Sequence, residues 1–227
     1  MLERQKSCYI PLMSQSLRFE DLGTQGFEKV WKFQENYRDE ILAGQTESKL
    51  FFVEHPPTFS MGRGEKGENL KQSEKAYQDM GIDMAWVNRG GKVTYHGPGQ
   101  LVAYPVFDLK QYRMGVKQFV CALEKVLIST LAEFGLQAHT QEGLIGTWLG
   151  TEKIASIGIH VKKSVSIHGL ALNVCPDMRY FSMIEPCGIR QVQMTSMKEQ
   201  GCNASVKEVS LVMAEVFAQH FGGHTRY

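Results

Sequence analysis

The sequence lacks several features that would place it in a specialised class of protein. No apolar run approaches the roughly 20 residues that a membrane-spanning helix needs, and the N-terminus from Met1 to Tyr9 is polar and charged. An excess of one charge is also missing, because 25 Lys and Arg balance 24 Asp and Glu to a formal net charge of +1. Such a chain has no global field that would attract nucleic acid or a membrane surface. We therefore expect a soluble cytoplasmic protein that binds neither.

Cysteine is scarce, and its spacing forms no framework. The chain has five cysteines, an odd number, and no Cys-x-x-Cys pair, in a sequence without a secretory signal. These features indicate neither a disulfide framework nor a zinc cage, so each thiol needs its own interpretation. Burial as a small hydrophobe is the simplest expectation for Cys121. The cysteines without a recognisable chemical context are Cys8, Cys121, Cys175 and Cys202.

The sequence does contain enough apolar material for a sizeable core. Its 227 residues are 43% hydrophobic, which suits one compact domain, or two closely packed ones. Amphipathic spacing predicts helices over residues 27–42, 115–134 and 206–221, the second of them ending before Gly135. Short aromatic and β-branched runs predict strands over residues 49–54, 83–87, 101–107, 145–149, 153–161 and 165–172.

The order of these elements indicates the fold class. Strands and helices interleave without a regular strand-helix-strand rhythm, which favours an α+β or mixed α/β sheet flanked by helices over a doubly wound parallel sheet. We expect Lys162 and Lys163 at a hairpin turn between the last two strands. The charged, glycine-rich segment from Gly62 to Asn69 is expected to be an exposed and mobile loop.

The densest unusual segment runs from Arg89 to Gln100 (RGGKVTYHGPGQ). Its glycines allow backbone N–H groups to face a ligand, while Arg89, Tyr95 and His96 can supply polar contacts. This composition indicates a binding loop, with an ordinary tight turn as the alternative. A nucleotide phosphate loop is a third possibility, but the segment lacks the Gly-Lys-Ser/Thr ending of that motif.

Cys187 differs from the other cysteines because it lies in a turn, between Pro186 and Gly188. A thiol in a turn can project into a cleft instead of packing on the face of an element. Its thiolate would be a strong nucleophile, and the thioester it forms would stay reactive toward an amine. A buried structural thiol is the alternative, and the local pattern alone leaves both interpretations open.

A catalytic thiolate needs a nearby cation, and the candidates are Lys153, His168 and His96. Lys153 opens an apolar run, so it could be buried, although a surface lysine at a strand end is the commoner outcome. His168 is followed by Gly169 and Ala171, which leave space on one strand face. That space could hold an acyl chain, but a plain packed strand fits nearly as well.

Four motifs together resemble the lipoyl(octanoyl) transferase family. They are RGGxVTYHGPGQ at residues 89–100, KIAxIG at 153–158, HGLALN at 168–173 and PCGI at 186–189. The motifs occur in the order found in that family, and the resemblance extends from about His55 to Ile189. It implies a biotin/lipoate protein ligase-like fold, with residues 1–227 as a single acyltransferase catalytic domain.

The resemblance also implies an activity. The family transfers octanoyl from octanoyl-acyl-carrier protein, through a cysteine thioester, to a lysine on lipoyl domains of 2-oxoacid dehydrogenases and on the glycine-cleavage H protein. Cys187 matches the nucleophile, and Lys153 matches the group that lowers the pKa of that thiol. No metal, ATP or other cofactor is implied, because the donor thioester is already activated. The residues matching the substrate site are Arg89, Gly90, Gly91, Lys92, Val93, Thr94, Tyr95, His96, Ser156, Ile157, Gly158, Gly169, Leu170 and Ala171.

Two other functions remain open at this point. An ATP-dependent lipoate ligase of the same fold would activate a free acid as an adenylate and would need no cysteine nucleophile. A non-catalytic carrier-binding protein would use the same pocket without turnover. Dependence on ATP and on Cys187 distinguishes the first function, and turnover by the wild-type protein excludes the second.

Overall fold

The computed structural model describes residues 17–186 and 192–222. Its helices are α1 (Phe27–Leu42), α2 (Glu74–Asp79), α3 (Val116–Glu133), α4 (Val206–Phe221) and the short 3-10 helix η1 (Met178–Met183). Its strands are β1 (Arg18–Thr24), β2 (Lys49–Glu54), β3 (Thr58–Met61), β4 (Asp83–Trp86), β5 (Val93–His96), β6 (Gln100–Val106), β7 (His139–Gln141), β8 (Leu144–Leu149), β9 (Glu152–Lys162) and β10 (Val165–Asn173).

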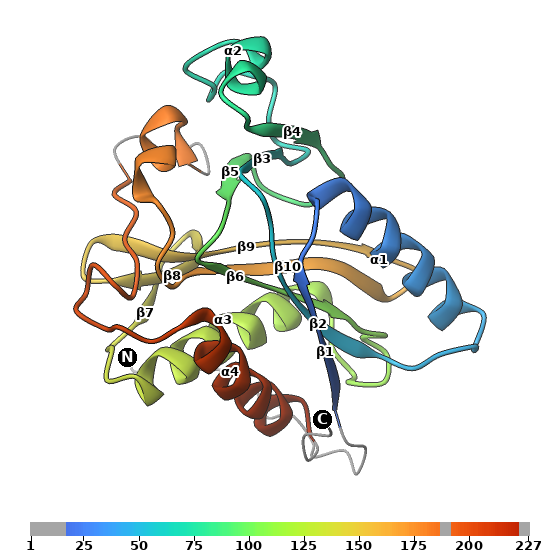
Figure 1. The fold of residues 1–227 in the computed structure, drawn as a ribbon. Coiled ribbons are helices and arrows are strands. Elements are labelled where there is room, and N and C mark those ends of the chain that lie inside the picture. The colour runs from blue at the N-terminus through green and yellow to red at the C-terminus, as the bar shows by residue number, and fades with distance from the viewer. Residues whose placement is uncertain (1–16, 187–191, 223–227) are drawn as a thin grey trace.

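The strands form two sheets, both of mixed direction (Figure 1). The main sheet has seven strands in the order β1-β2-β6-β10-β9-β8-β7, and β1 pairs parallel with β2 while the other neighbours pair antiparallel. The small sheet has the order β4-β3-β5, with β3 parallel to β4 and antiparallel to β5. The predicted mixed sheet flanked by helices is thus confirmed.

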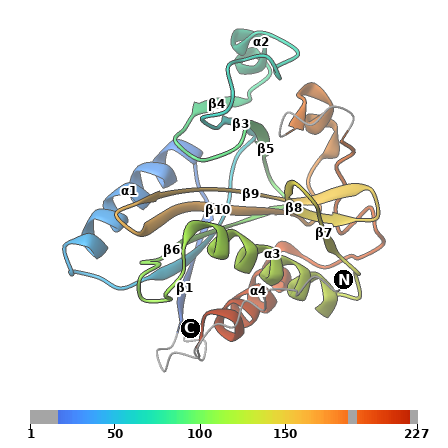
Figure 2. The same cartoon turned by 180° about the vertical axis from the view of Figure 1, so that it is seen from behind.

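Different helices cover the two faces of the main sheet. Successive residues of a strand point to opposite faces, and β6 divides in this way. Leu101 and Ala103 belong to the core under α3 and α4, whereas Val102 and Tyr104 belong to the core under α1. Figures 1 and 2 show α3 and α4 together on one side of the sheet, with the small sheet and α1 on the other.

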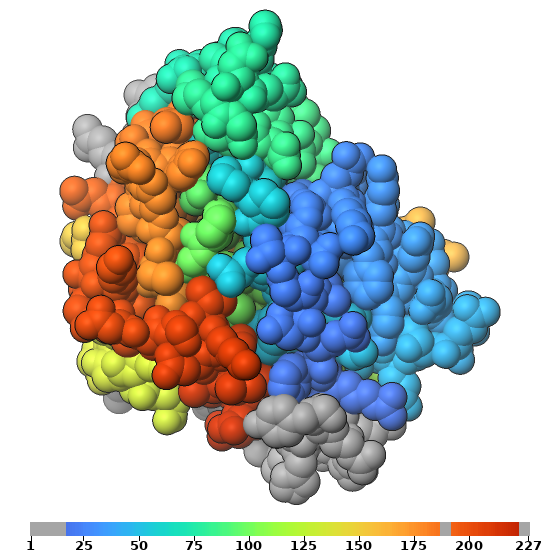
Figure 3. All heavy atoms as spheres, in the orientation of Figure 1, coloured from blue at the N-terminus to red at the C-terminus, as the bar shows by residue number. Residues whose placement is uncertain are grey.

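The small sheet packs against the segment that contains η1. The rings of Tyr95 and Tyr180 stack with centroids 4.6 Å apart, and Phe181 and Ile184 join the buried cluster around Phe59. In Figure 3 the orange surface of the η1 segment borders the green surface of the α2 region. This packing brings the chain leading to residue 186 beside the small sheet.

Most of the predicted elements are confirmed. All three predicted helices and all six predicted strands are present, with no boundary displaced by more than one residue. The hairpin turn comes one residue later than expected, because Lys163 and Ser164 take the left-handed φ values of 49° and 75°. The sequence patterns do not indicate β1, β3, β5 or β7. None of the helices in the described ranges is long and apolar enough to cross a membrane.

The expectation that Gly62 to Asn69 is an exposed loop is wrong in part. Glu65 and Asn69 are each only 5% exposed, although Arg63, Lys66 and Glu68 are at the surface. The charged composition is misleading because the Glu65 carboxylate is directed inward, where it accepts hydrogen bonds from amide N–H groups.

Candidate active site

A pocket lies on the α1 side of the main sheet, where β5, β6, β9 and β10 meet the segment 89–92. Its empty volume is about 460 Å³, part of which is open to solvent. The predicted site residues in its lining are Arg89, Gly91, Lys92, Thr94, His96, Ser156, Ile157, Gly158, Gly169, Leu170 and Ala171. The lining residues outside that prediction are Phe27, Val102, Tyr104 and His168.

Three of the predicted substrate-site residues lie outside the lining. Val93 and Tyr95 are buried in the small-sheet cluster, because alternate residues of β5 face opposite ways and Thr94 and His96 take the pocket side. The Gly90 N–H donates to the Ile159 carbonyl at 3.0 Å, which ties the segment 89–92 to β9. The apolar-polar alternation of residues 93–96 is the sequence signal that separates these roles.

His96 is held neutral at the inner end of the pocket. Its Nδ1 lies 2.9 Å from Gln100 Oε1, and the Gln100 amide nitrogen donates to Asn173, so Nδ1 is the donor in this pair. Its Nε2 therefore accepts from the Ser60 hydroxyl at 3.0 Å, and Ser60 Oγ accepts from Arg89 at 2.9 Å. Burial keeps the pKa of His96 well below its usual value.

His168 lies where the pairing of β10 with β6 is interrupted. The Ser166 N–H donates to the Phe107 carbonyl, and Leu170 is paired with Ala103. In this register His168 lies opposite Pro105, which has no N–H to donate. The Pro105 carbonyl accepts from the Ser166 hydroxyl at 2.7 Å, and the His168 N–H donates to Gln34 of α1 at 2.7 Å. These replacement bonds allow His168 its left-handed φ of 58°.

The His168 ring is neutral as well. Its Nε2 lies 2.8 Å from the side-chain oxygen of Asn88, so this nitrogen carries the proton. Burial lowers the pKa of His168 to about 3. Neither His168 nor His96 is therefore a cation near neutral pH, which leaves Lys153 as the remaining candidate of the three to support a thiolate.

Lys153 is buried at the start of β9, so the commoner expectation of a surface lysine is wrong. Its side chain is 1% exposed, its Nζ donates to the Ile145 carbonyl at 2.9 Å, and Nζ lies 5.0 Å from the centre of the Trp148 ring. Gly146 packs flat against it, since a Cβ there would come within 2.6 Å of Lys153 Cε. Ser156 is the first residue of β9 that lines the pocket. Lys153 lies three residues before it, or roughly 10 Å along the strand.

Cys187 lies outside the described residues, as does Cys8. Described residues before and after Cys187 form backbone hydrogen bonds: the Glu185 N–H donates to the Asn69 carbonyl at 2.9 Å, and the Lys153 N–H donates to the Gln193 carbonyl at 2.8 Å. Residue 185 thus lies beside Asn69, and residue 193 lies beside Lys153.

The other described cysteines lie in ordinary surroundings. Cys175 is exposed, and Cys121 and Cys202 are partly buried. Over residues 17–186 and 192–222, no group of three or more His, Cys, Asp or Glu side chains is arranged to hold a metal ion.

Comparisons with known proteins connect this geometry to a family. The model of the lipoyl protein ligase A/B catalytic domain matches residues 27–218. One curated relative is an octanoyltransferase of Xanthomonas campestris pv. campestris (strain B100), 37% identical over 212 residues, which are 93% of this chain and 88% of the relative. Another is an octanoyltransferase of Shewanella loihica (strain ATCC BAA-1088 / PV-4), 38% identical over 216 residues and 94% of each chain.

Solved structures resemble the chain in fold. A structure of the archaeal lipoylation system of Thermoplasma acidophilum, described as a bi-partite lipoate protein ligase and its E2 lipoyl domain, matches with a TM-score of 0.74 at 17% identity, over 94% of this chain and 86% of that one. A biotin protein ligase of Aquifex aeolicus matches with a TM-score of 0.55 at 12% identity, over 90% and 70%.

The fold is therefore that of the lipoate and biotin protein ligases, as the sequence motifs predict. The chain belongs to the lipoyl protein ligase A/B catalytic domain family, and the two curated relatives described above are named octanoyltransferases. The prediction that it is an acyltransferase is confirmed.

Proposed function

We propose that this enzyme takes an octanoyl group from octanoyl-acyl-carrier protein onto Cys187 and passes it to the target lysine of a lipoyl domain. The proposed acceptors are the lipoyl domains of 2-oxoacid dehydrogenases and the glycine-cleavage H protein, in the cytoplasm. Octanoyl transfer is supported by the names of the curated relatives. The observation that carries the rest is a largely apolar pocket together with a buried lysine on the same strand, β9, three residues before the first lining residue of that strand.

The pocket supports an acyl chain as the ligand. Two small residues of β10 lie in the lining: Gly169, which packs so close to β6 that a Cβ would meet the Ala103 carbonyl at 2.1 Å, and Ala171, two residues further on. Phe27 and Val102 add apolar surface. An alkyl chain placed there gains about 0.8 kcal/mol for each methylene group removed from water.

The first half-reaction forms the acyl-enzyme. The Cys187 thiolate attacks the thioester carbonyl of the donor, and the tetrahedral intermediate collapses by breaking the bond to the carrier sulfur. The protonated Lys153 stabilises the thiolate beforehand and gives its proton to the departing carrier thiolate. Lys153 is then neutral, and the octanoyl group is a thioester on Cys187.

The second half-reaction uses that neutral lysine. The amine of the acceptor lysine attacks the Cys187 thioester, and its extra proton passes to Lys153 as the amide bond forms. Cys187 leaves as a thiolate, which restores the starting state with Lys153 protonated. Lys153 thus gives up one proton in the first half-reaction and accepts one in the second.

Intact-protein mass spectrometry tests this proposal. The wild type and Cys187→Ala are incubated with octanoyl-acyl-carrier protein without ATP, and then with a lipoyl domain. We expect an octanoyl adduct on the wild type that the lipoyl domain removes, and none on the variant. Transfer that requires free octanoate and ATP, with no adduct on the wild type, would favour the ligase function instead.

A further inference from the structure

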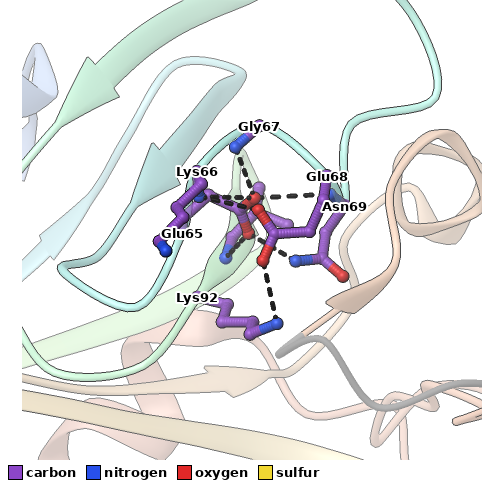
Figure 4. A network of polar contacts seen from close by, with 7 residues as sticks. Glu65, Lys66, Gly67, Glu68, Asn69 and Lys92 are labelled. Carbon is purple, nitrogen blue, oxygen red and sulfur yellow. Dashed lines mark hydrogen bonds and ion pairs between the residues drawn. The ribbon is translucent and has the colours of Figure 1, made fainter.

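The loop between β3 and α2 contains a buried acid that the proposed chemistry does not use. Glu65 Oε1 accepts the backbone N–H groups of Lys66, Gly67 and Asn69 at 3.2, 2.8 and 3.3 Å. Its Oε2 accepts from the Asn69 side-chain amide at 2.9 Å and from the Val93 N–H at 3.1 Å. Figure 4 shows this network, in which every donor to Glu65 is an amide N–H.

One side of this loop is joined to the wall of the pocket. The backbone N–H groups of residues 62, 63 and 64 donate to the carbonyls of Lys92, Arg89 and Gly91 at 3.3, 3.0 and 3.0 Å. Those three acceptor residues line the pocket. The bond from Val93 to Glu65 continues the connection by one residue along β5. Four hydrogen bonds therefore connect the loop to the pocket wall and to β5.

The opposite side of the loop holds the chain that leads to residue 187. The Asn69 carbonyl accepts the Glu185 N–H at 2.9 Å, and Leu70 forms an antiparallel bridge with Ile184. Asn69 is itself fixed to Glu65 through both its backbone and its side chain. A continuous path of hydrogen bonds thus runs from Val93 through Glu65 and Asn69 to Glu185.

We propose that Glu65 is a positioning residue, which sets the register between the acyl pocket and the segment entering Cys187. The inference rests on the proposed thioester route. The partners of Glu65 among the described residues are amide N–H groups. The effect of Glu65 is geometric, because an octanoyl group must fill the pocket while its carbonyl carbon is within reach of the thiolate. A misplacement of about 1 Å in such an arrangement can cost on the order of a hundred-fold in rate.

Glu65→Gln selectively removes the hydrogen bonds that Glu65 accepts at Oε2. The glutamine amide oxygen can still accept the three N–H groups that Oε1 accepts. Its NH₂ group would then face the Val93 N–H and the Asn69 side-chain amide, which are both donors, so these two bonds are lost. The loop keeps its three backbone bonds to position 65, and it loses the side-chain bond to Asn69 as well as the bond to β5.

The test compares Glu65→Gln with the wild type in single-turnover formation of the Cys187 thioester from octanoyl- and butanoyl-acyl-carrier protein. A short chain leaves most of the pocket empty, so it depends less on the register. We expect octanoyl loading to fall roughly ten-fold or more and the octanoyl-to-butanoyl rate ratio to fall at least about three-fold. Glu133→Gln on α3, an exposed position, should change neither rate.

The outcomes separate this inference from the proposed function. If the wild type forms no thioester, the proposed function fails. If it does, and Glu65→Gln loads both donors at wild-type rates or slows both equally, Glu65 is structural only and the inference is overturned. Should Glu65→Gln not fold by circular dichroism, Asn69→Ala removes one of the five bonds to Glu65 and should lower the rate ratio in the same direction. An unchanged ratio there overturns the inference as well.

Discussion

We expect the free energy of unfolding of this enzyme to decrease as the pH falls from 6.5 to 5, a range in which surface carboxylates remain charged. Three histidines around the pocket are buried, with exposures of 0% for His55, 5% for His96 and 1% for His168. Burial lowers the pKa of His55 to about 4 and that of His168 to about 3, and it holds the pKa of His96 well below its usual value. In the unfolded chain each returns to about 6.5.

The sign and size of the effect follow from proton linkage. Between pH 6.5 and the folded-state pKa values, the unfolded chain binds protons that the folded enzyme cannot, so the free energy of unfolding decreases as the pH falls. Each histidine contributes about 1.4 kcal/mol per pH unit in that window. At pH 5 the loss is about 2 kcal/mol per histidine and about 6 kcal/mol for the three, which is comparable to the whole stability of many domains. The partly exposed His160 and His220 shift in the same direction and add less.

Urea unfolding at fixed ionic strength between pH 5 and 8.5 measures this effect. We expect a flat region above pH 7.5 and a slope below pH 6.5 that corresponds to about three protons taken up on unfolding. Replacing His55 with glutamine should lower the slope by about one proton, and replacing the exposed His139 should leave it unchanged. A free energy of unfolding that stays constant from pH 7 to pH 5 would refute the assignment of neutral, buried rings.

Three substitutions test the site itself. Lys153→Met keeps the length of the side chain without its proton, and thioester formation measured by intact mass should fall about a hundred-fold or more. Gly146→Ala places a Cβ 2.5 Å from the Ala155 carbonyl and 2.6 Å from Lys153 Cε, so it should cost about 1–3 kcal/mol in thermal unfolding and slow loading. Gly26→Ala, where a Cβ meets nothing within 4 Å, is its control. Ala171→Leu should fill the pocket and slow octanoyl loading more than butanoyl loading, and equal slowing of both donors would place the acyl chain elsewhere.

Local patterns predicted most of the fold because the signals for it are local. The amphipathic spacing that predicts α1 and the apolar run that predicts β2 each lie within about 16 residues, and the predicted bounds match the structure. Glu65 shows the limit of this reasoning. A glutamate among glycines and other charged residues is typical of a solvent-exposed loop, but Glu65 is 5% exposed and accepts a hydrogen bond from Val93, 28 residues away.

The position of the pocket depends on contacts between residues that are still farther apart in the sequence. Pro105 in a central strand argues locally against a continuous ladder, but it does not identify the groups that replace the missing bonds. The replacements come from Ser166, 61 residues away, and from Gln34, which is 134 residues from His168. With these bonds the chain can place a histidine with a left-handed backbone beside Gly169, and both residues line the pocket. The motif at 168–173 indicates a ligand site, whereas the reason that the site is open lies in β6 and α1.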